Sequence, residues 1–336
     1  MLKLESVQNE LLYKFRSEAE LTKTINEMSL NFTSRRDQIT KYISDEKFIS
    51  AYVCFYLLTN IPKLKKSFEK MNFDLSQLNE FEFIDIGCGP GTFSFALLEQ
   101  DPKLTIYGFE KSEKMIKQAH LLLSRFYPAA KVKLFSKISK IPLKQKTRFG
   151  VFGHSANEMD ESYVLQLIDD LQLDNILFIE PGTKDFFHKS LTLREQLTKK
   201  FTLNYPCLSQ KPCPLTGIDD WCHQYIEVTH EKSLERLSQL VNKDRRRMPV
   251  ILNYYTRLPT SVQEDEAIIM RVYKPTKYSV EWQICMRDNI LCDLEVPIRG
   301  FSKQEKKEIL KYNSGAKIRF TLLKKLGDNK IRGKLL

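Results

Sequence analysis

The sequence lacks any apolar run that approaches the ~20 residues a helix needs to cross a bilayer. Its first residues, Met1-Leu-Lys-Leu-Glu-Ser6, lack the basic-then-apolar pattern of a secretory signal peptide. The chain also has no internal repeat, and its 336 residues suggest about two domains. We therefore expect a cytoplasmic protein without membrane contact. The oligomeric state is left open.

Disulfides are a second expected absence. Seven cysteines in a reducing compartment do not predict a disulfide framework. Cys54 lies in an apolar helical stretch and is interpreted as a small core residue.

Acidic residues are outnumbered, with 42 Asp and Glu against 53 Lys and Arg, for a formal charge of +11. Such an excess favours a polyanionic partner, usually nucleic acid, although a basic enzyme would have the same composition. The basic residues form three separated clusters, which favours an RNA-facing surface. The clusters are Lys63, Lys65 and Lys66; Arg245, Arg246 and Arg247; and the tail from Lys303 to Lys334.

Hydrophobic spacing divides the chain. Helical periodicity, including Tyr42, Ile43, Phe48 and Ile49, continues to about Lys70. Strands then alternate with helices from Phe81 to Glu180, which predicts a parallel, doubly wound, Rossmann-like sheet. Predicted strands are 81–86, 104–110, 131–135, 151–155 and 175–180, and predicted helices are 92–100, 113–127 and 161–171.

Beyond Phe201 the alternation stops. A Pro- and Cys-bearing segment and a charged helical stretch precede β-rich runs at 249–255, 267–273 and 278–286, for which a small barrel is one arrangement. The predicted domains are a helical region (1–75), a Rossmann-like S-adenosylmethionine domain (76–200), a cysteine-bearing metal-cluster segment (201–248) and a basic β-rich unit (249–336).

The segment Asp85-Ile-Gly-Cys-Gly-Pro-Gly-Thr92 joins the first predicted strand to the first helix of the sheet. Gly87, Gly89 and Gly91 let a ligand approach the backbone, and the following helix N-terminus favours electron-rich groups. Glu110 ends the second strand, where a carboxylate can accept hydrogen bonds from ribose hydroxyls. The Gly-x-Gly-x-Gly spacing led by Asp85 resembles motif I of class I methyltransferases and predicts bound S-adenosylmethionine.

The segment His154-Ser-Ala-Asn-Glu-Met159 leaves the fourth strand, where such enzymes place substrate-facing residues. It lacks the Asn/Asp-Pro-Pro-Tyr tetrapeptide of base amino-group methylation, and no catalytic base is evident. Pro206-Cys207 and Pro212-Cys213 are similar to the nucleophilic Pro-Cys of RNA cytosine-5 methyltransferases. Both follow the fifth strand rather than the fourth, so we reject that role.

Three cysteines, Cys207, Cys213 and Cys222, lie within sixteen residues of a loop rich in Pro and Gly. Loop cysteines in a reducing compartment favour metal binding over core packing, although three unrelated thiols would look the same. Cys285, Cys292 and the adjacent His223 are candidates for a fourth ligand. Four thiolates suit zinc or an iron–sulfur cluster, and spacing does not choose between them.

Several motifs together resemble the ribosomal small-subunit protein 22 family, methyltransferase-like proteins of mitochondrial and bacterial small ribosomal subunits. The resemblance covers most of the chain, and its most specific part is the cysteine block after a Glu-Pro-Gly-Thr turn. The matching pieces are Ala51-Tyr52, Asn60-Ile-Pro62, Asp85 to Thr92, Asn157-Glu158, Glu180-Pro-Gly-Thr183, Arg194, Cys213-Pro-Leu215, Asp220-Trp-Cys-His223 and Cys285.

The resemblance implies a protein that engages small-subunit ribosomal RNA during assembly, with Asn157 among its cofactor-binding residues. It also implies a four-iron, four-sulfur cluster on Cys207, Cys213, Cys222 and Cys285. Leu208-Ser209 stands where the family has Pro-His after its first cysteine. The resemblance leaves methyl transfer open, so we keep an active rRNA methyltransferase as a hypothesis. The alternative is a methyltransferase that acts on a small molecule or protein and contains a structural zinc.

Overall fold

The computed structural model describes residues 2–34, 44–258 and 264–336. The chain divides into two compact units. Unit 1 comprises residues 1–159, 166–174 and 226–248, and unit 2 comprises residues 160–165, 175–225 and 249–336. No helix among the described residues has the length and apolar character that a bilayer span requires. All seven cysteines are free of disulfide bonds in the structure.

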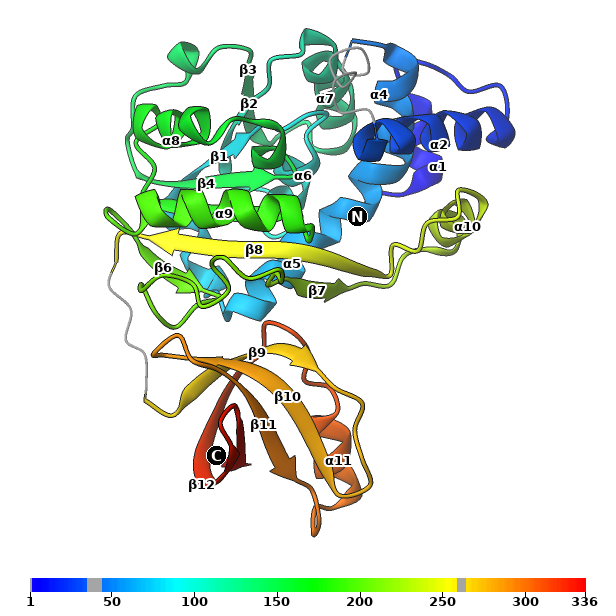
Figure 1. The fold of residues 1–336 in the computed structure, drawn as a ribbon. Coiled ribbons are helices and arrows are strands. Elements are labelled where there is room, and N and C mark those ends of the chain that lie inside the picture. The colour runs from blue at the N-terminus through cyan, green and yellow to red at the C-terminus, as the bar shows by residue number, and fades with distance from the viewer. Residues whose placement is uncertain (1, 35–43, 259–263) are drawn as a thin grey trace. The chain divides into compact units, whose positions relative to one another are not determined.

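The sheet of unit 1 is parallel, with the strand order β3-β2-β1-β4 (Figure 1). Its strands are β1 (Phe81–Ile86), β2 (Thr105–Phe109), β3 (Lys131–Phe135) and β4 (Thr147–Gly153). Helix α6 (Thr92–Leu98) follows β1, and α7 (Glu113–Phe126) follows β2. Each residue of β1 is buried, as expected of a central strand covered on both faces.

Strand β4 begins four residues before the predicted start at Val151, and the reason is Arg148. This side chain is 3% exposed, and its guanidinium donates hydrogen bonds to the carbonyls of Leu171 and Pro142. Its Nε also lies 3.5 Å from Oε2 of the buried Glu82. A buried arginine with an ion-pair partner can sit in a strand, but it interrupts the apolar pattern that sequence reasoning uses.

Helices precede β1, as the helical spacing predicted, whereas Tyr42 and Ile43 lie outside the described residues. Cys54 is fully buried, as predicted. The α-helices are α1 (Leu4–Val7), α2 (Glu18–Ser34), α4 (Glu46–Tyr52) and α5 (Leu58–Met71), and α10 (Lys232–Leu240) joins the same unit. Short turns are η1 (Gln8–Glu10), η3 (Val53–Leu57, π-helical), η4 (Leu75–Glu80), η5 (Ile138–Lys140) and η6 (Ala156–Glu158).

Unit 2 contains an antiparallel strand run, β5-β8-β6, with β7 paired to β8. These strands are β5 (Asn175–Pro181), β6 (Thr202–Tyr205), β7 (Gln224–Glu227) and β8 (Arg247–Thr256). Helix α8 (Glu161–Asp170) precedes β5, and α9 (Lys184–Leu197) follows it. The strand order β3-β2-β1-β4 of unit 1 and the order β5-β8-β6 of unit 2 are both those of class I methyltransferases. This confirms the predicted fold class.

The C-terminal part of unit 2 is a closed five-stranded barrel, β10-β11-β13-β12-β9 (Figure 1). Its elements are β9 (Glu266–Val272), β10 (Ser279–Met286), β11 (Leu291–Pro297), α11 (Lys303–Ile309), β12 (Lys317–Gly327) and β13 (Lys330–Leu335). Strands β11 and β13 are parallel, the other pairs are antiparallel, and α11 lies between the third and fourth strands. This is the strand order of an OB-fold, and Trp282 is the largest side chain of its core.

Candidate functional site

The first candidate site lies where the strand order of unit 1 reverses. Chain order moves outward from β1 through β2 to β3, whereas β4 lies on the other side of β1. Ligands of open α/β sheets bind at such a switch point, outside the carboxyl ends of the strands. The loop after β1 and the segment after β4 both leave from this edge.

Three glycines shape the loop after β1. Gly87, Gly89 and Gly91 have φ angles of +68°, +54° and +94°, a left-handed conformation that disfavours other residues. A Cβ at Gly87 would lie 2.6 Å from the Ser155 Cβ, whereas a Cβ at Gly89 would have no atom within 4 Å. Gly87 is therefore required for packing against the segment after β4, and Gly89 leaves space for a ligand.

The loop is fixed to the end of β2. The carbonyl of Phe109 accepts hydrogen bonds from the amides of Gly87 (2.8 Å) and Cys88 (3.0 Å). The next residue, Glu110, accepts from the amides of Gly89 (3.0 Å) and Ser112 (2.8 Å). A carboxylate has about four lone-pair positions, so Glu110 retains the capacity to accept a further bond from a hydroxyl group. Burial raises the pKa of Glu110.

Asp85 has a different position from the one expected of a ligand-facing residue. It is 1% exposed, and its Oδ2 accepts from the amide and the hydroxyl of Ser94, both at 2.7 Å. Burial raises its pKa to about 7. These bonds join the end of β1 to the first turn of α6, so the observed contacts of Asp85 shape the loop.

The segment after β4 lies against this loop. Ser155 donates from Oγ to the carbonyl of Ile86 at 2.6 Å, which brings η6 beside the glycines. Asn157 is half-buried on η6, and its Nδ2 lies 3.5 Å from the carbonyl of His154. The structure therefore brings five of the predicted cofactor residues to one edge of unit 1 and places Asn157 on the neighbouring segment.

His154 forms a contact that sequence reasoning missed. Its Nε2 lies 2.6 Å from the Nζ of Lys63, whose side chain is only 1% exposed. Burial lowers the pKa of His154 well below 6.5, and the charges of Lys63 and Arg245 lower it further. An ammonium group has only donors, so a charged Lys63 donates to a neutral imidazole.

Arg245 completes this group of nitrogen-bearing side chains. Its guanidinium donates to Asn60 Oδ1 (2.7 Å) and Thr59 Oγ1 (3.3 Å) and lies 5.6 Å from the ring centroid of Tyr56. Burial lowers its pKa. A dense set of donors beside the carboxyl end of β4 could orient an anionic or carbonyl-bearing substrate.

Two predicted basic clusters are thereby corrected. Lys63 is buried in unit 1 and Arg245 is half-buried against Tyr56 and Asn60, so neither is exposed as expected of a basic surface cluster. Lys66, Arg246 and Arg247 instead line one open hollow together with Glu227 and Asp244. Helical spacing explains Lys63, because it lies one turn from Ser67 on the buried side of α5.

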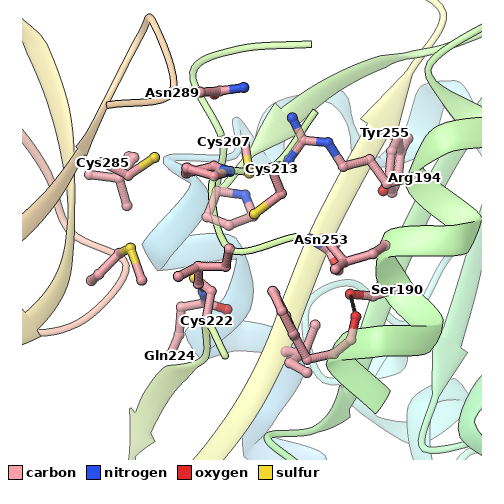
Figure 2. Close-up of a pocket in the computed structure, with 18 residues that line it drawn as sticks. Ser190, Arg194, Cys207, Cys213, Cys222, Gln224, Asn253, Tyr255, Cys285 and Asn289 are labelled. Atoms are coloured by element: carbon pink, nitrogen blue, oxygen red, sulfur yellow. Dashed lines mark hydrogen bonds between the residues drawn. The ribbon is translucent and has the colours of Figure 1, made fainter. Parts of the chain in front are cut away.

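The second candidate site is a cavity within unit 2 that all four predicted metal-ligating cysteines line (Figure 2). Cys207 follows β6, Cys213 and Cys222 lie in the loop between β6 and β7, and Cys285 lies on β10. In Figure 2 the sulfur of Cys285 points toward the segment that carries Cys207 and Cys213. Residues 78 positions apart in sequence thus face one space.

Burial raises the pKa of three of these thiols. It raises the pKa of Cys213, raises that of Cys285 to about 12, and raises that of Cys222 well above the ordinary value. Neighbouring sulfurs contribute to each shift, since a thiolate disfavours a second negative charge nearby. A cation in the cavity would reverse this effect, because a metal ligand must be a thiolate.

Arg194 on α9 supplies positive charge at the cavity. Its guanidinium donates to Cys207 Sγ at 3.0 Å and to the carbonyls of Ser209 (2.7 Å) and Lys211 (2.6 Å). Gln224 contributes a weaker contact, with its Nε2 3.7 Å from Cys222 Sγ. Such donors stabilise sulfur that carries negative charge.

The other fourth-ligand candidates lie elsewhere. Cys292 is buried in the core of the barrel, where burial raises its pKa to about 11. His223 does not line the cavity, and its ring stacks on that of Trp221 with 5.7 Å between centroids. Within the described residues, no three His, Cys, Asp or Glu side chains are arranged to hold a single metal ion.

Fold and sites together define a class I methyltransferase-like protein with a thiol-lined cavity in its second unit. The profile of the family described as mitochondrial small ribosomal subunit Rsm22 matches residues 48–296, about three quarters of the chain. The chain belongs to this family, as its motifs predicted. A search of curated proteins found no match.

Two solved methyltransferase structures show distant likeness to this chain. Magnesium protoporphyrin IX methyltransferase from Synechocystis PCC 6803, with bound S-adenosylmethionine, has 11% identity and a TM-score of 0.38 over 70% of this chain and 97% of that one. Precorrin-6y C5,15-methyltransferase from Geobacter metallireducens GS-15 has 16% identity and a TM-score of 0.35 over 56% and 88%. The strand order and the family match, rather than these scores, support the assignment.

Proposed function

We propose that this protein is a small-ribosomal-subunit assembly factor that binds S-adenosylmethionine in unit 1 and a four-iron, four-sulfur cluster in unit 2. Family membership supports the ribosomal role. The observation that carries the proposal is the convergence of Cys207, Cys213, Cys222 and Cys285 on one cavity, since neither core packing nor disulfide formation requires it.

The donor set fits an iron–sulfur cluster. Four thiols line one cavity, and in a four-iron cluster each thiolate binds a different iron, so the four need not meet at one point. Arg194 and Gln224 direct N–H groups at two of the sulfurs, as hydrogen-bond donors do around clusters. When bound, the cluster would supply a structural cross-link between β10 and the loop before β7, together with a redox-sensitive group.

The loop after β1 has space and a hydrogen-bond acceptor for S-adenosylmethionine. The conformation of the loop opens space at Gly89, and Glu110 retains acceptor capacity for ribose hydroxyls. Asn157 and His154 follow β4, where we place the substrate side, and Lys63 on α5 contacts His154. Methyl transfer to ribosomal RNA is part of this proposal as a separable activity, because cofactor binding alone could serve assembly.

The first test is iron, sulfide and zinc analysis, with a visible spectrum, on protein purified without oxygen. We expect iron and acid-labile sulfide in near-equal amounts and broad brown absorbance. Zinc alone would refute the cluster and favour the alternative of a structural zinc. Cys292→Ser is the matched control, because this cysteine lies outside the cavity and should retain the iron.

The ribosomal role needs a separate test. Tagged protein should co-sediment with immature small subunits at low salt, and the association should weaken steeply as salt rises. Absence of co-sedimentation at low salt would overturn the assembly role. An rRNA modification that is absent after deletion, and restored by wild-type protein but not by a folded Gly89→Ala protein, would support methyl transfer; an unchanged map would exclude it.

A further inference from the structure

The C-terminal barrel has the strand order of an OB-fold, and ligands of such barrels commonly contact the loops between strands 1 and 2 and between strands 4 and 5. In this chain these loops join β9 to β10 and β12 to β13. Both carry the chemistry that recognises nucleic acid, and nothing in the thiol cavity or the cofactor loop uses them.

The β9–β10 loop presents two aromatic rings beside two lysines, in the sequence Tyr273-Lys-Pro-Thr-Lys-Tyr278. Tyr273 is 37% exposed and Tyr278 is 62% exposed, which is unusual for such large rings. The Lys277 Nζ lies 5.8 Å from the centre of the Tyr278 ring. Exposed aromatic rings beside cations form stacking platforms for unpaired bases.

The β12–β13 hairpin is basic and emerges from the barrel. Every residue from Thr321 to Gly327 is exposed, so this part of the hairpin is not held by core packing. Residues 317–336 contain seven Lys or Arg and one acidic residue, Asp328. Across the described parts of the chain, Lys324, Lys325 and Lys334 have no carboxylate within ion-pair distance. These lysines are available to phosphate groups.

The sheet face between these loops, formed by β10 and β11, carries carboxylates. Its outward carboxylates are Glu281 on β10 and Asp293 and Glu295 on β11. Glu281 pairs with Lys330 at 2.6 Å, and Glu295 pairs with Arg332 at 3.1 Å. Tyr273 donates from its hydroxyl to Asp293 at 3.1 Å. Paired carboxylates at this face disfavour a phosphate backbone there, so the loops remain as the contact points.

We propose that the β9–β10 loop and the β12–β13 hairpin bind an unpaired RNA segment, with bases stacked on Tyr273 and Tyr278 and phosphates held by Lys324 and Lys325. This deepens the proposed ribosomal role, on which it rests, by naming the surface and the kind of RNA. A duplex fits less well, because its paired bases offer no open faces to the tyrosines.

The test is fluorescence anisotropy of the full-length holoprotein with a labelled, unstructured RNA. Its length of about 16 nucleotides covers the site size of one OB-fold. The same RNA annealed to its complement is the duplex for comparison. Tyr273→Ala/Tyr278→Ala should weaken single-strand binding by about five- to hundredfold per stacked base and leave the salt dependence unchanged. Tyr273→Phe/Tyr278→Phe keeps the rings and should bind like wild type.

The charge arm uses Lys324→Gln/Lys325→Gln, which should lower the slope of log affinity against log salt by about 1.4 for two single-strand phosphate contacts. The matched control is Lys303→Gln/Lys307→Gln on α11, which removes the same charge from exposed positions and should leave the slope nearly unchanged. Equal losses in both variants, a preference for duplex, or wild-type binding by the Tyr→Ala variant would overturn the inference.

Co-sedimentation of the same variants with small subunits separates this inference from the proposed function. Wild-type protein that associates with subunits, together with barrel variants that bind RNA normally, would leave the ribosomal role standing and remove the barrel from it. Wild-type protein that binds RNA but no subunit would overturn the ribosomal role alone. Loss of subunit association by the hairpin variant with intact RNA binding would assign the hairpin to a protein partner.

Discussion

Gly87 and Gly89 make a matched pair for testing the cofactor loop. Both have left-handed backbone, at φ +68° and +54°, so an added methyl group strains each by about 1–2 kcal/mol. Only Gly87 adds a collision, with the Ser155 Cβ at 2.6 Å, and overpacking of this kind costs about 1–3 kcal/mol. We therefore expect the free energy of unfolding to fall by about 1–2 kcal/mol in Gly89→Ala and about 2–5 kcal/mol in Gly87→Ala.

The affinity for S-adenosylmethionine should fall in Gly89→Ala, the variant that loses less stability. The methyl group of Gly89→Ala enters the space that the loop leaves open, so S-adenosylmethionine should bind at least about tenfold more weakly, a loss of ~1.4 kcal/mol. Urea unfolding and titration calorimetry measure the two quantities. Gly300→Ala is the control, because Gly300 also has a positive φ and open surroundings but lies in unit 2. A folded Gly89→Ala protein with wild-type affinity would refute the assignment of this loop.

Three further changes test other parts of the two sites. Cys285→Ser should abolish stoichiometric iron and sulfide, whereas Cys292→Ser should lower stability by about 1–3 kcal/mol and retain both; iron retained in Cys285→Ser would contradict the cavity assignment. Glu110→Gln should weaken S-adenosylmethionine binding roughly tenfold in calorimetry through loss of a charged acceptor, and unchanged affinity would remove Glu110 from the site. Because the pKa of His154 is lowered in the folded protein, His154 is protonated in the unfolded chain first as pH falls below ~6.5. The free energy of unfolding should therefore fall by up to ~1.4 kcal/mol per pH unit in acid. His154→Asn tolerates the φ of +59° and should flatten urea-measured stability between pH 7.5 and 5.5, whereas an unchanged slope would show that another group titrates.

Local signals made the cofactor loop predictable, because glycine spacing between a strand and a helix lies within eight residues. The cavity was predictable only in part. Three of its cysteines are close in sequence, but Cys285 lies 63 residues after Cys222, and spacing could not choose it over Cys292. In the structure, strand alternation in β10 buries Trp282 and Ile284 and turns Cys285 out of the barrel core, where it lines the cavity.

The barrel topology was beyond sequence reasoning for a different reason. Strand β12 loses its alternating pattern where it leaves the core, because Leu322 and Leu323 are exposed rather than buried. The parallel pairing of β11 with β13 joins Asp293 to Lys330, and no local pattern encodes such a distant partner. Buried Lys63 was missed because lysine is rarely buried, so a cluster of lysines is taken as a solvated surface.

The division of unit 1 along the chain has a consequence for its synthesis. The unit includes residues 226–248, and Glu231 accepts from the amide of Leu4 at 2.8 Å while Arg245 bonds to Asn60. The amino-terminal helices therefore cannot complete their contacts until Arg245 has left the ribosome. During that interval, Leu4 and Asn60 lack partners that follow 227 and 185 residues later in the chain. A pause or truncation before Arg245 should leave nascent chains that depend on chaperones.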